Sequence, residues 1–175
     1  MKTYTLKDIR KLNPCYDPSK YALKDWEGTI LDILNADIVP AYDRIWLACE
    51  LLDDKTNRLF AVYCAKEALK LINKPDKRSI KACNVAEKYA NGKASIQELR
   101  AAYSAANTAV YAARASNAAA YAARAAYAAS NAATNSAAYA AYAASNAATN
   151  SAANTAVARQ NQIAKLIEMV QELEN

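Results

Sequence analysis

The sequence contains no histidine and, among its 175 residues, only two glycines, four prolines and one phenylalanine. The lack of histidine removes the most common general base and transition-metal ligand, and with them every Ser-His or Cys-His dyad. The scarcity of Gly and Pro argues against a β-sandwich, a β-barrel or a Gly-rich phosphate loop. Alanine, the best helix former, supplies much of the 54% apolar content. The composition therefore predicts an all-α fold, a multi-helix bundle without a sheet.

Long hydrophobic runs and closely spaced cysteine pairs are missing as well. No stretch of about 18 uncharged, strongly apolar residues occurs, and the first residues lead into no apolar segment of a signal peptide. We therefore expect a cytoplasmic protein without a membrane contact. The cysteines form no C-x-x-C motif and are expected to be reduced thiols in the core, with no metal and no cofactor bound. They are Cys15, Cys49, Cys64 and Cys83.

Negative charge is missing from most of the C-terminal part. Residues 99–167 contain no Asp or Glu, and their only charged residues are Arg100, Arg114, Arg124, Arg159 and Lys165. Residues 1–100 instead mix 18 basic with 14 acidic groups, which is typical of solvated helix faces. A long segment with positive charge only can accept an anion without repelling it.

Helix breakers and caps divide the chain into two parts of one helical domain, residues 1–175. Residues 1–93 are predicted to form a scaffold of short helices. These helices are expected near residues 6–12, 18–28, 30–34, 40–52 and 55–73, and from residue 75 to a left-handed stop at Asn91 and Gly92. Residues 94–175 are predicted to form long helices rich in Ala, Tyr and Asn. A capping box of Ser95 and Glu98 begins this second part.

Apolar side chains with helical spacing define the predicted core, and the alanine-rich part is expected to fold back against it. The predicted core residues are Leu31, Leu34, Ile45, Trp46, Cys49, Leu59, Val62, Cys64, Leu69, Ile80 and Val85. A final amphipathic helix is predicted either to close the bundle or to pair two chains. Its apolar residues are Ile163, Leu166, Ile167, Val170 and Leu173.

Alanine accounts for 30 of the 56 residues from 101 to 156, a tract without Gly or Pro. Within it, residues 127–138 recur letter for letter at residues 142–153. A continuous helix from residue 95 to residue 174 would be about 120 Å long, too long for a domain of this size. We therefore expect at least one reversal. The candidates are the Ser/Asn/Thr clusters near residues 130–131, 135–136 and 150–151, where side chains compete for backbone hydrogen bonds.

Tyrosine, asparagine and arginine side chains recur on one side of this predicted helix, while the opposite side is almost pure Ala and Ser. Aromatic rings, amides and cations without carboxylates are a suitable lining for a base-plus-phosphate ligand. The same residues would equally serve close helix packing, with the arginines reaching solvent. The candidate ligand-binding residues are Tyr103, Asn107, Tyr111, Arg114, Tyr121, Arg124, Asn131, Asn135 and Tyr139.

Several segments carry a resemblance to a known family. The runs AEKYANGKAS at residues 86–95 and ELRAA at residues 98–102, followed by the alanine and tyrosine tract, resemble the bacterial and phage "putative immunity protein" family. Residues 13–15, 46–49 and 59–68 fit it too. The resemblance implies an all-α protein without enzymatic activity that neutralises a partner toxin. Inhibitors of basic nuclease toxins usually have an acidic surface, whereas this chain carries a net charge of +5, and like charges slow encounter.

Four classes of function remain open. The acid-free tract favours sequestration of a small anionic nucleotide-type immune signal, as a phage anti-defence sponge would do. The resemblance favours immunity-type inhibition of a protein toxin or effector. A purely structural or oligomerising helical protein is the third class. An enzyme is indicated only by Glu50, Asp53 and Asp54 near one helix end. Nucleic-acid binding is disfavoured because the basic residues of the first part are interleaved with acids.

Overall fold

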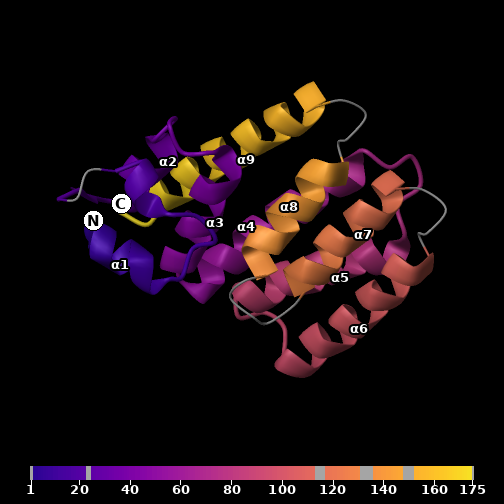
Figure 1. The fold of residues 1–175 in the computed structure, drawn as a ribbon. Coiled ribbons are helices and arrows are strands. Elements are labelled where there is room, and N and C mark those ends of the chain that lie inside the picture. Colours follow the sequence, from indigo (N-terminus) through magenta and orange to yellow (C-terminus); the bar gives the residue numbers. More distant parts are fainter. Residues whose placement is uncertain (1, 23–24, 113–116, 131–135, 148–151, 175) are drawn as a thin grey trace.

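The computed structural model describes residues 2–22, 25–112, 117–130, 136–147 and 152–174, except for the side chains of residues 111–112, 117–120, 136–138 and 152–153. The described residues form nine α-helices and one small sheet (Figure 1). The predicted all-α fold class is confirmed. The prediction that the protein contains no sheet is wrong, because Tyr4–Thr5 (β1) pairs antiparallel with Glu27–Gly28 (β2).

Short elements form the N-terminal layer. They are α1 (Leu6–Lys11), the 3-10 helix η1 (Pro18–Lys20) and α2 (Ile30–Asn35). Capping boxes of Thr5 with Asp8 and of Thr29 with Asp32 begin the two α-helices. The predicted helix over residues 18–28 is wrong. A Cβ at Gly28 would lie 2.6 Å from Cζ2 of Trp26, so this glycine permits a close approach of backbone to ring rather than ending a helix.

Three longer helices follow, and α4 is the central one. They are α3 (Ala41–Leu51), α4 (Asp54–Lys70) and α5 (Lys77–Ala90). The buried Asn57 of α4 donates its Nδ2 protons to the carbonyl oxygens of Cys49 at 2.7 Å and Leu52 at 3.2 Å. These bonds satisfy carbonyls at the end of α3 and hold it against α4. The predicted left-handed stop after α5 is confirmed, since Gly92 has φ +69°.

The alanine-rich part forms four helices. They are α6 (Ile96–Ala112), α7 (Asn117–Ser130), α8 (Ser136–Ala147) and α9 (Ala152–Glu172). Figure 1 shows α6, α7 and α8 side by side, with successive helices running in opposite directions. Helices end or begin next to all three predicted Ser/Asn/Thr clusters, and a further interruption separates α6 from α7. Because α4 contacts both α7 and α8, the predicted folding of this part against the scaffold is confirmed.

One main cluster of buried side chains contains residues of both parts, from Tyr4 to Val170. Most of the predicted core is confirmed. Leu34, Ile45, Cys49, Val62, Cys64 and Leu69 are buried, and Leu31, Trp46, Leu59 and Val85 pack against the cluster partly buried. The placement of Ile80 is wrong, because its side chain is 38% exposed. The buried face of α5 consists instead of small side chains, Ser79, Ala82, Cys83 and Ala86, which permit close approach of its neighbours.

Two further predictions need partial correction. Cys49, Cys64 and Cys83 are buried free thiols as predicted, but Cys15 is exposed in the connection between α1 and η1. The last helix closes the bundle, with Ile163, Leu166 and Val170 buried and Ile167 partly buried. Leu173 is 58% exposed because α9 ends at Glu172.

The duplicated segment takes the same structure in both copies where it is described. Ser130 of α7 and Ser145 of α8 are both buried, and each donates its hydroxyl proton to the carbonyl three residues earlier at 2.9 Å. The tyrosine at the start of each copy contacts another tyrosine ring. Tyr127 pairs with Tyr103 of α6, and Tyr142 pairs with Tyr42 of α3.

The capping box at the start of α6 provides a first test of the fold. Ser95 Oγ accepts the backbone proton of Glu98 at 3.2 Å, and the Glu98 carboxylate accepts that of Ser95 at 2.7 Å. Ser95→Ala should lower the free energy of unfolding by about 1 kcal/mol, measured by urea denaturation. The matched control is Ser104→Ala in the exposed middle of α6, which should change it by less than about 0.5 kcal/mol. Equal effects of the two substitutions would contradict the capping role.

Candidate functional site

The predicted ligand-binding residues do not share one continuous helix. Because α6 ends at Ala112 and α7 begins at Asn117, the helical phase that placed Tyr111 and Tyr121 on one side does not extend between them. Tyr103 and Asn107 lie on α6, Tyr121 and Arg124 on α7, and Tyr139 on α8. Arg114, Asn131 and Asn135 lie outside the described residues, as does the side chain of Tyr111.

Two of these tyrosines are engaged within the protein. The centroids of the Tyr103 and Tyr127 rings lie 4.4 Å apart, and the two hydroxyls are hydrogen-bonded. The half-buried Tyr121 ring packs against the main core, and the guanidinium carbon of the exposed Arg124 lies 5.4 Å from its centroid. These contacts belong to helix packing, the alternative that the sequence left open. A ligand on this face stays a prediction.

A groove of about 470 Å³ lies between α4, α8 and α9, and we call it the α4–α8–α9 groove. None of the predicted ligand-binding residues lines it. Its lining residues are Tyr63, Cys64, Glu67, Ala68, Leu71, Ala144, Ala147, Asn154, Val157, Ala158, Asn161 and Gln162. In Figure 1 the first half of α9 lies apart from the ribbon of α7, and the groove residues of α9 all lie between Asn154 and Gln162.

The floor of the groove is small and apolar, while large apolar side chains stand at its rim. Cys64 and Ala68 from α4 and Ala144 from α8 are buried. Leu71 is 55% exposed and Val157 is 59% exposed. A hollow with an apolar floor and a few polar groups is typical of binding sites in proteins.

Gln162 connects the groove to the core. Its side chain is 4% exposed, and its Nε2 donates to the carbonyl oxygen of Ala141 at 2.9 Å, which holds α9 against α8. Its Oε1 is buried and has no hydrogen-bond partner among the described residues. A buried acceptor without a donor is costly, so Gln162 is a polar side chain that packing alone does not explain.

The sequence carried weak signals for this groove. Val157 is a branched apolar residue in a polar and alanine-rich stretch, and Gln162 stands one turn before Leu166 in the apolar line of the last helix. The predicted amphipathic unit comprised only residues 163–173. It therefore did not include the first half of α9, where Asn154, Val157 and Asn161 are exposed.

The polar groups of the groove are neutral or already paired. Glu67 pairs with Lys70 at 2.5 Å, and just beyond the groove Lys165 pairs with Glu168 at 2.6 Å. Burial, with smaller effects of neighbouring charges, raises the pKa of Tyr63, which therefore keeps its phenolic proton. Burial also raises the pKa of the Cys64 thiol, so this sulfur is protonated and not a nucleophile. The groove thus offers apolar contact and neutral hydrogen-bonding groups.

The model of the "Imm-5 like putative immunity protein" family matches residues 47–169. The chain belongs to this family. Every residue that lines the α4–α8–α9 groove lies within the match, and the resemblance seen in the sequence is confirmed. Comparison with curated proteins and with solved structures found no match.

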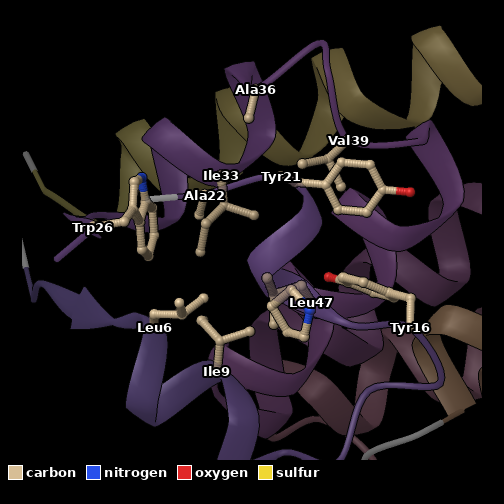
Figure 2. A pocket seen from close by; sticks show the side chains of 11 residues that line it. Leu6, Ile9, Tyr16, Tyr21, Ala22, Trp26, Ile33, Ala36, Val39 and Leu47 are labelled. Atoms are coloured by element: carbon tan, nitrogen blue, oxygen red, sulfur yellow. The ribbon is translucent and has the colours of Figure 1, made fainter. Parts of the chain in front are cut away.

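The N-terminal layer, which the immunity-protein family model does not cover, contains a smaller cavity of about 60 Å³ (Figure 2). Figure 2 shows Trp26 on one side of it and Tyr16 and Tyr21 on the other, with the two tyrosine rings edge to face at 5.7 Å. Small-molecule sites usually measure about 300 to 1,000 Å³. This cavity is therefore too small for a ligand and reflects the packing of short elements.

Of the three carboxylates that suggested an enzyme, Glu50, Asp53 and Asp54, one has a structural role. Asp53 is the N-cap of α4 and accepts the backbone protons of Lys55 and Thr56. The part of the chain that the structure describes holds no group of three or more Cys, Asp or Glu side chains suited to a metal ion. Among the described helices, none combines the length and apolar composition needed to cross a membrane.

Proposed function

We propose that the protein is an immunity-type inhibitor without enzymatic activity that binds a protein toxin or effector at the α4–α8–α9 groove. The observation that carries the proposal is the place of this groove. It lies within the residues matched by the immunity-protein family, and exposed Leu71 and Val157 stand beside its apolar floor. Exposed apolar side chains around a hollow are typical of the central contacts of protein interfaces.

The charge of the chain limits the kind of partner. The net charge is +5, and residues 99–167, which include all of α8 and α9 as far as Ile167, carry no acidic group. A strongly basic partner would be repelled, whereas a neutral or acidic surface would associate readily. We therefore infer an acidic or neutral partner surface, and expect the association rate to fall as salt is added.

Co-expression tests the proposal. Where a toxin domain is encoded beside the gene, the wild-type protein should restore growth of cells that produce this toxin. The two purified proteins should also form a stable complex in size-exclusion chromatography. Toxin released from the complex should have an unchanged mass and regain its activity, because inhibition by occupancy leaves it intact. Failure of both rescue and complex formation would contradict the inhibitor assignment, and a cleaved or modified toxin would contradict its non-enzymatic nature.

The acid-free tract favours a second candidate, sequestration of a small anionic nucleotide-type immune signal, as in phage anti-defence. Arg124 is exposed on α7 and available to an anion. A nucleotide at 100 times its dissociation constant should stabilise the fold by about 2.7 kcal/mol. A thermal-shift screen with mono-, di- and cyclic nucleotides would detect this. If none of these nucleotides shifts the unfolding temperature, nucleotide sequestration is rejected and inhibition of a protein remains as the proposed function.

A double substitution connects that screen to the predicted residues. Arg114→Ala with Arg124→Ala should abolish the nucleotide shift and leave the unfolding temperature without ligand nearly unchanged, because alanine is the better helix former. The control is Arg100→Ala, which removes a charge from the exposed start of the same acid-free tract. A double variant that loses stability but still shifts with nucleotide would make both arginines structural.

A further inference from the structure

Arg159 occupies an unusual position on α9. It lies one turn before Ile163 and two turns before Leu166, in the line of side chains that faces the core, and both of those residues are buried. Arg159 itself is half-buried, and its Nε is buried without a hydrogen-bond partner. A charge withdrawn from water costs free energy unless it is paired, so this position is not explained by stability.

Two tyrosines come from α3 and α8, which contact each other and both contact α9. Tyr42 of α3 and Tyr142 of α8 pack edge to face, with ring centroids 5.8 Å apart and an angle of 72° between the rings. Arg159 lies near enough to Tyr42 to oppose the rise in that phenol's pKa caused by burial. Neither hydroxyl makes a hydrogen bond within the described part of the chain. Helices α3, α8 and α9 thus bring two phenols and a guanidinium near one another, and Tyr142, which is 41% exposed, leaves this cluster open to solvent and to a ligand.

No acidic side chain compensates Arg159. Residues 99–167 lack Asp and Glu. Asp43 neighbours Tyr42 on α3, but among the described residues it forms no ion pair with Arg159. The buried Arg44 shows how this fold treats an arginine that serves structure. Its Nε is buried without a partner, as that of Arg159 is, but its Nη1 donates to Asp37 at 2.8 Å and to the carbonyl oxygen of Leu34 at 2.9 Å. Among the described residues, by comparison, none accepts a hydrogen bond from any nitrogen of Arg159.

We propose that Arg159, Tyr42 and Tyr142 form a binding site for a carboxylate, presented by an aspartate or glutamate side chain of a partner protein. The planar guanidinium offers parallel N–H donors that match the two oxygens of a carboxylate, and the phenols add O–H donors. The single positive charge of the cluster balances a single carboxylate. Only the choice of a protein as the source of this group rests on the proposed inhibitor function.

NMR of protein labelled with ¹⁵N-arginine tests the site without the toxin. The Nε–Hε signals are recorded during titration with sodium acetate, sodium phosphate or sodium chloride at equal ionic strength. Arg159→Lys and Arg124→Lys assign the two signals of interest. With acetate, the Arg159 signal should shift to saturation, half-complete on the order of tens of millimolar, as expected for one charge-assisted contact. The exposed Arg124 should shift little and without saturation.

A stability measurement complements the titration. Acetate should raise the unfolding temperature of the wild type but not that of Arg159→Met, and this variant alone should be at least as stable as the wild type, since it removes an unpaired charge. Equal shifts of Arg159 and Arg124 would overturn the site. So would a marked loss of stability in Arg159→Met, which would make the arginine structural. Phosphate binding ten-fold tighter than acetate would overturn the carboxylate in favour of a phosphoryl ligand.

These outcomes are separate from those for the inhibitor function. If acetate binds saturably but the protein fails to neutralise the toxin, the carboxylate site is retained and only the toxin is rejected as the source of the carboxylate. Neutralisation that persists unchanged in Arg159→Met would reject the partner's carboxylate at this place while leaving the groove as the interface.

Discussion

Val157→Asp should weaken toxin binding by about 100-fold, equivalent to about 2.7 kcal/mol, without unfolding the protein. Val157 is 59% exposed at the rim of the α4–α8–α9 groove, so its replacement removes little from the core. In the free protein the new carboxylate would stay in contact with water, because position 157 is exposed. In the complex, however, it would be buried beside the apolar floor without a cation. Isothermal titration with purified toxin measures the loss.

The matched control for this variant is Ile38→Asp. Ile38 is 71% exposed and lies in the N-terminal layer, outside the residues matched by the family. Both variants exchange an exposed branched residue for aspartate and change the net charge equally. A similar loss of affinity in both would mean that charge, and not the groove, determines binding. Full affinity in Val157→Asp would remove this side of the groove from the interface.

Phe60→Ala should lower the free energy of unfolding by about 3 to 5 kcal/mol. Phe60 is the only phenylalanine of the chain, and its side chain is 0% exposed in α4. Alanine would lose the burial of the ring and leave a cavity that rigid helices on several sides cannot close. Since single domains are stabilised by about 5 to 15 kcal/mol, the variant should be marginally folded. Urea denaturation followed by circular dichroism measures the change.

Leu59→Ala is the control for Phe60→Ala. Leu59 is the adjacent residue of α4 and is only partly buried against the core. Its truncation should therefore cost clearly less than that of Phe60. If the two substitutions destabilise the protein equally, Phe60 does not occupy the tightly packed centre that the structure gives it.

The case of Phe60 shows why the sequence could predict the helices better than their buried faces. Leu59, Val62 and Leu69 mark one apolar stripe on α4, and this stripe led to a correct helix. The structure surrounds α4 with α5, α7, α8 and α9, so the buried surface is wider than one stripe and includes Phe60. The number of neighbours around a helix is a tertiary property, which periodicity along one segment does not contain.

Ile80 failed as a core residue for a related reason. Hydrophobicity favours isoleucine over Ser79 or Ala82, but α5 contacts α4, α6 and α7 at once. Close approach on three sides selects small side chains, and the isoleucine is left at the surface. In an alanine-rich bundle, side-chain size decides burial as much as polarity does.

The candidate site was less accessible from the sequence than the fold. The predicted face belonged to one continuous helix, whereas the structure has two helices, one ending at Ala112 and the next beginning at Asn117. The predicted angular relation between residues on either side therefore does not hold. The α4–α8–α9 groove joins residues of α4 to residues about 70 to 100 positions later in α8 and α9, which only the tertiary packing of these helices brings together. Arg159 was recognised as one of few charges in the tract, but its neighbours on α3 and α8 were not predictable.

The duplicated segment has a consequence for folding. Because α7 at residues 127–130 and α8 at residues 142–145 share the run Tyr-Ala-Ala-Ser, each helix presents the same pair of buried alanines, the same buried serine and the same leading tyrosine to its surroundings. An arrangement in which the copies exchange places, or in which a second chain contributes one of them, would bury nearly the same surface. Only the connections and the differing partners, Tyr103 for Tyr127 and Tyr42 for Tyr142, distinguish the correct order. The repeated segment thus provides packing surface twice, and it also stabilises an alternative arrangement that competes with the native topology.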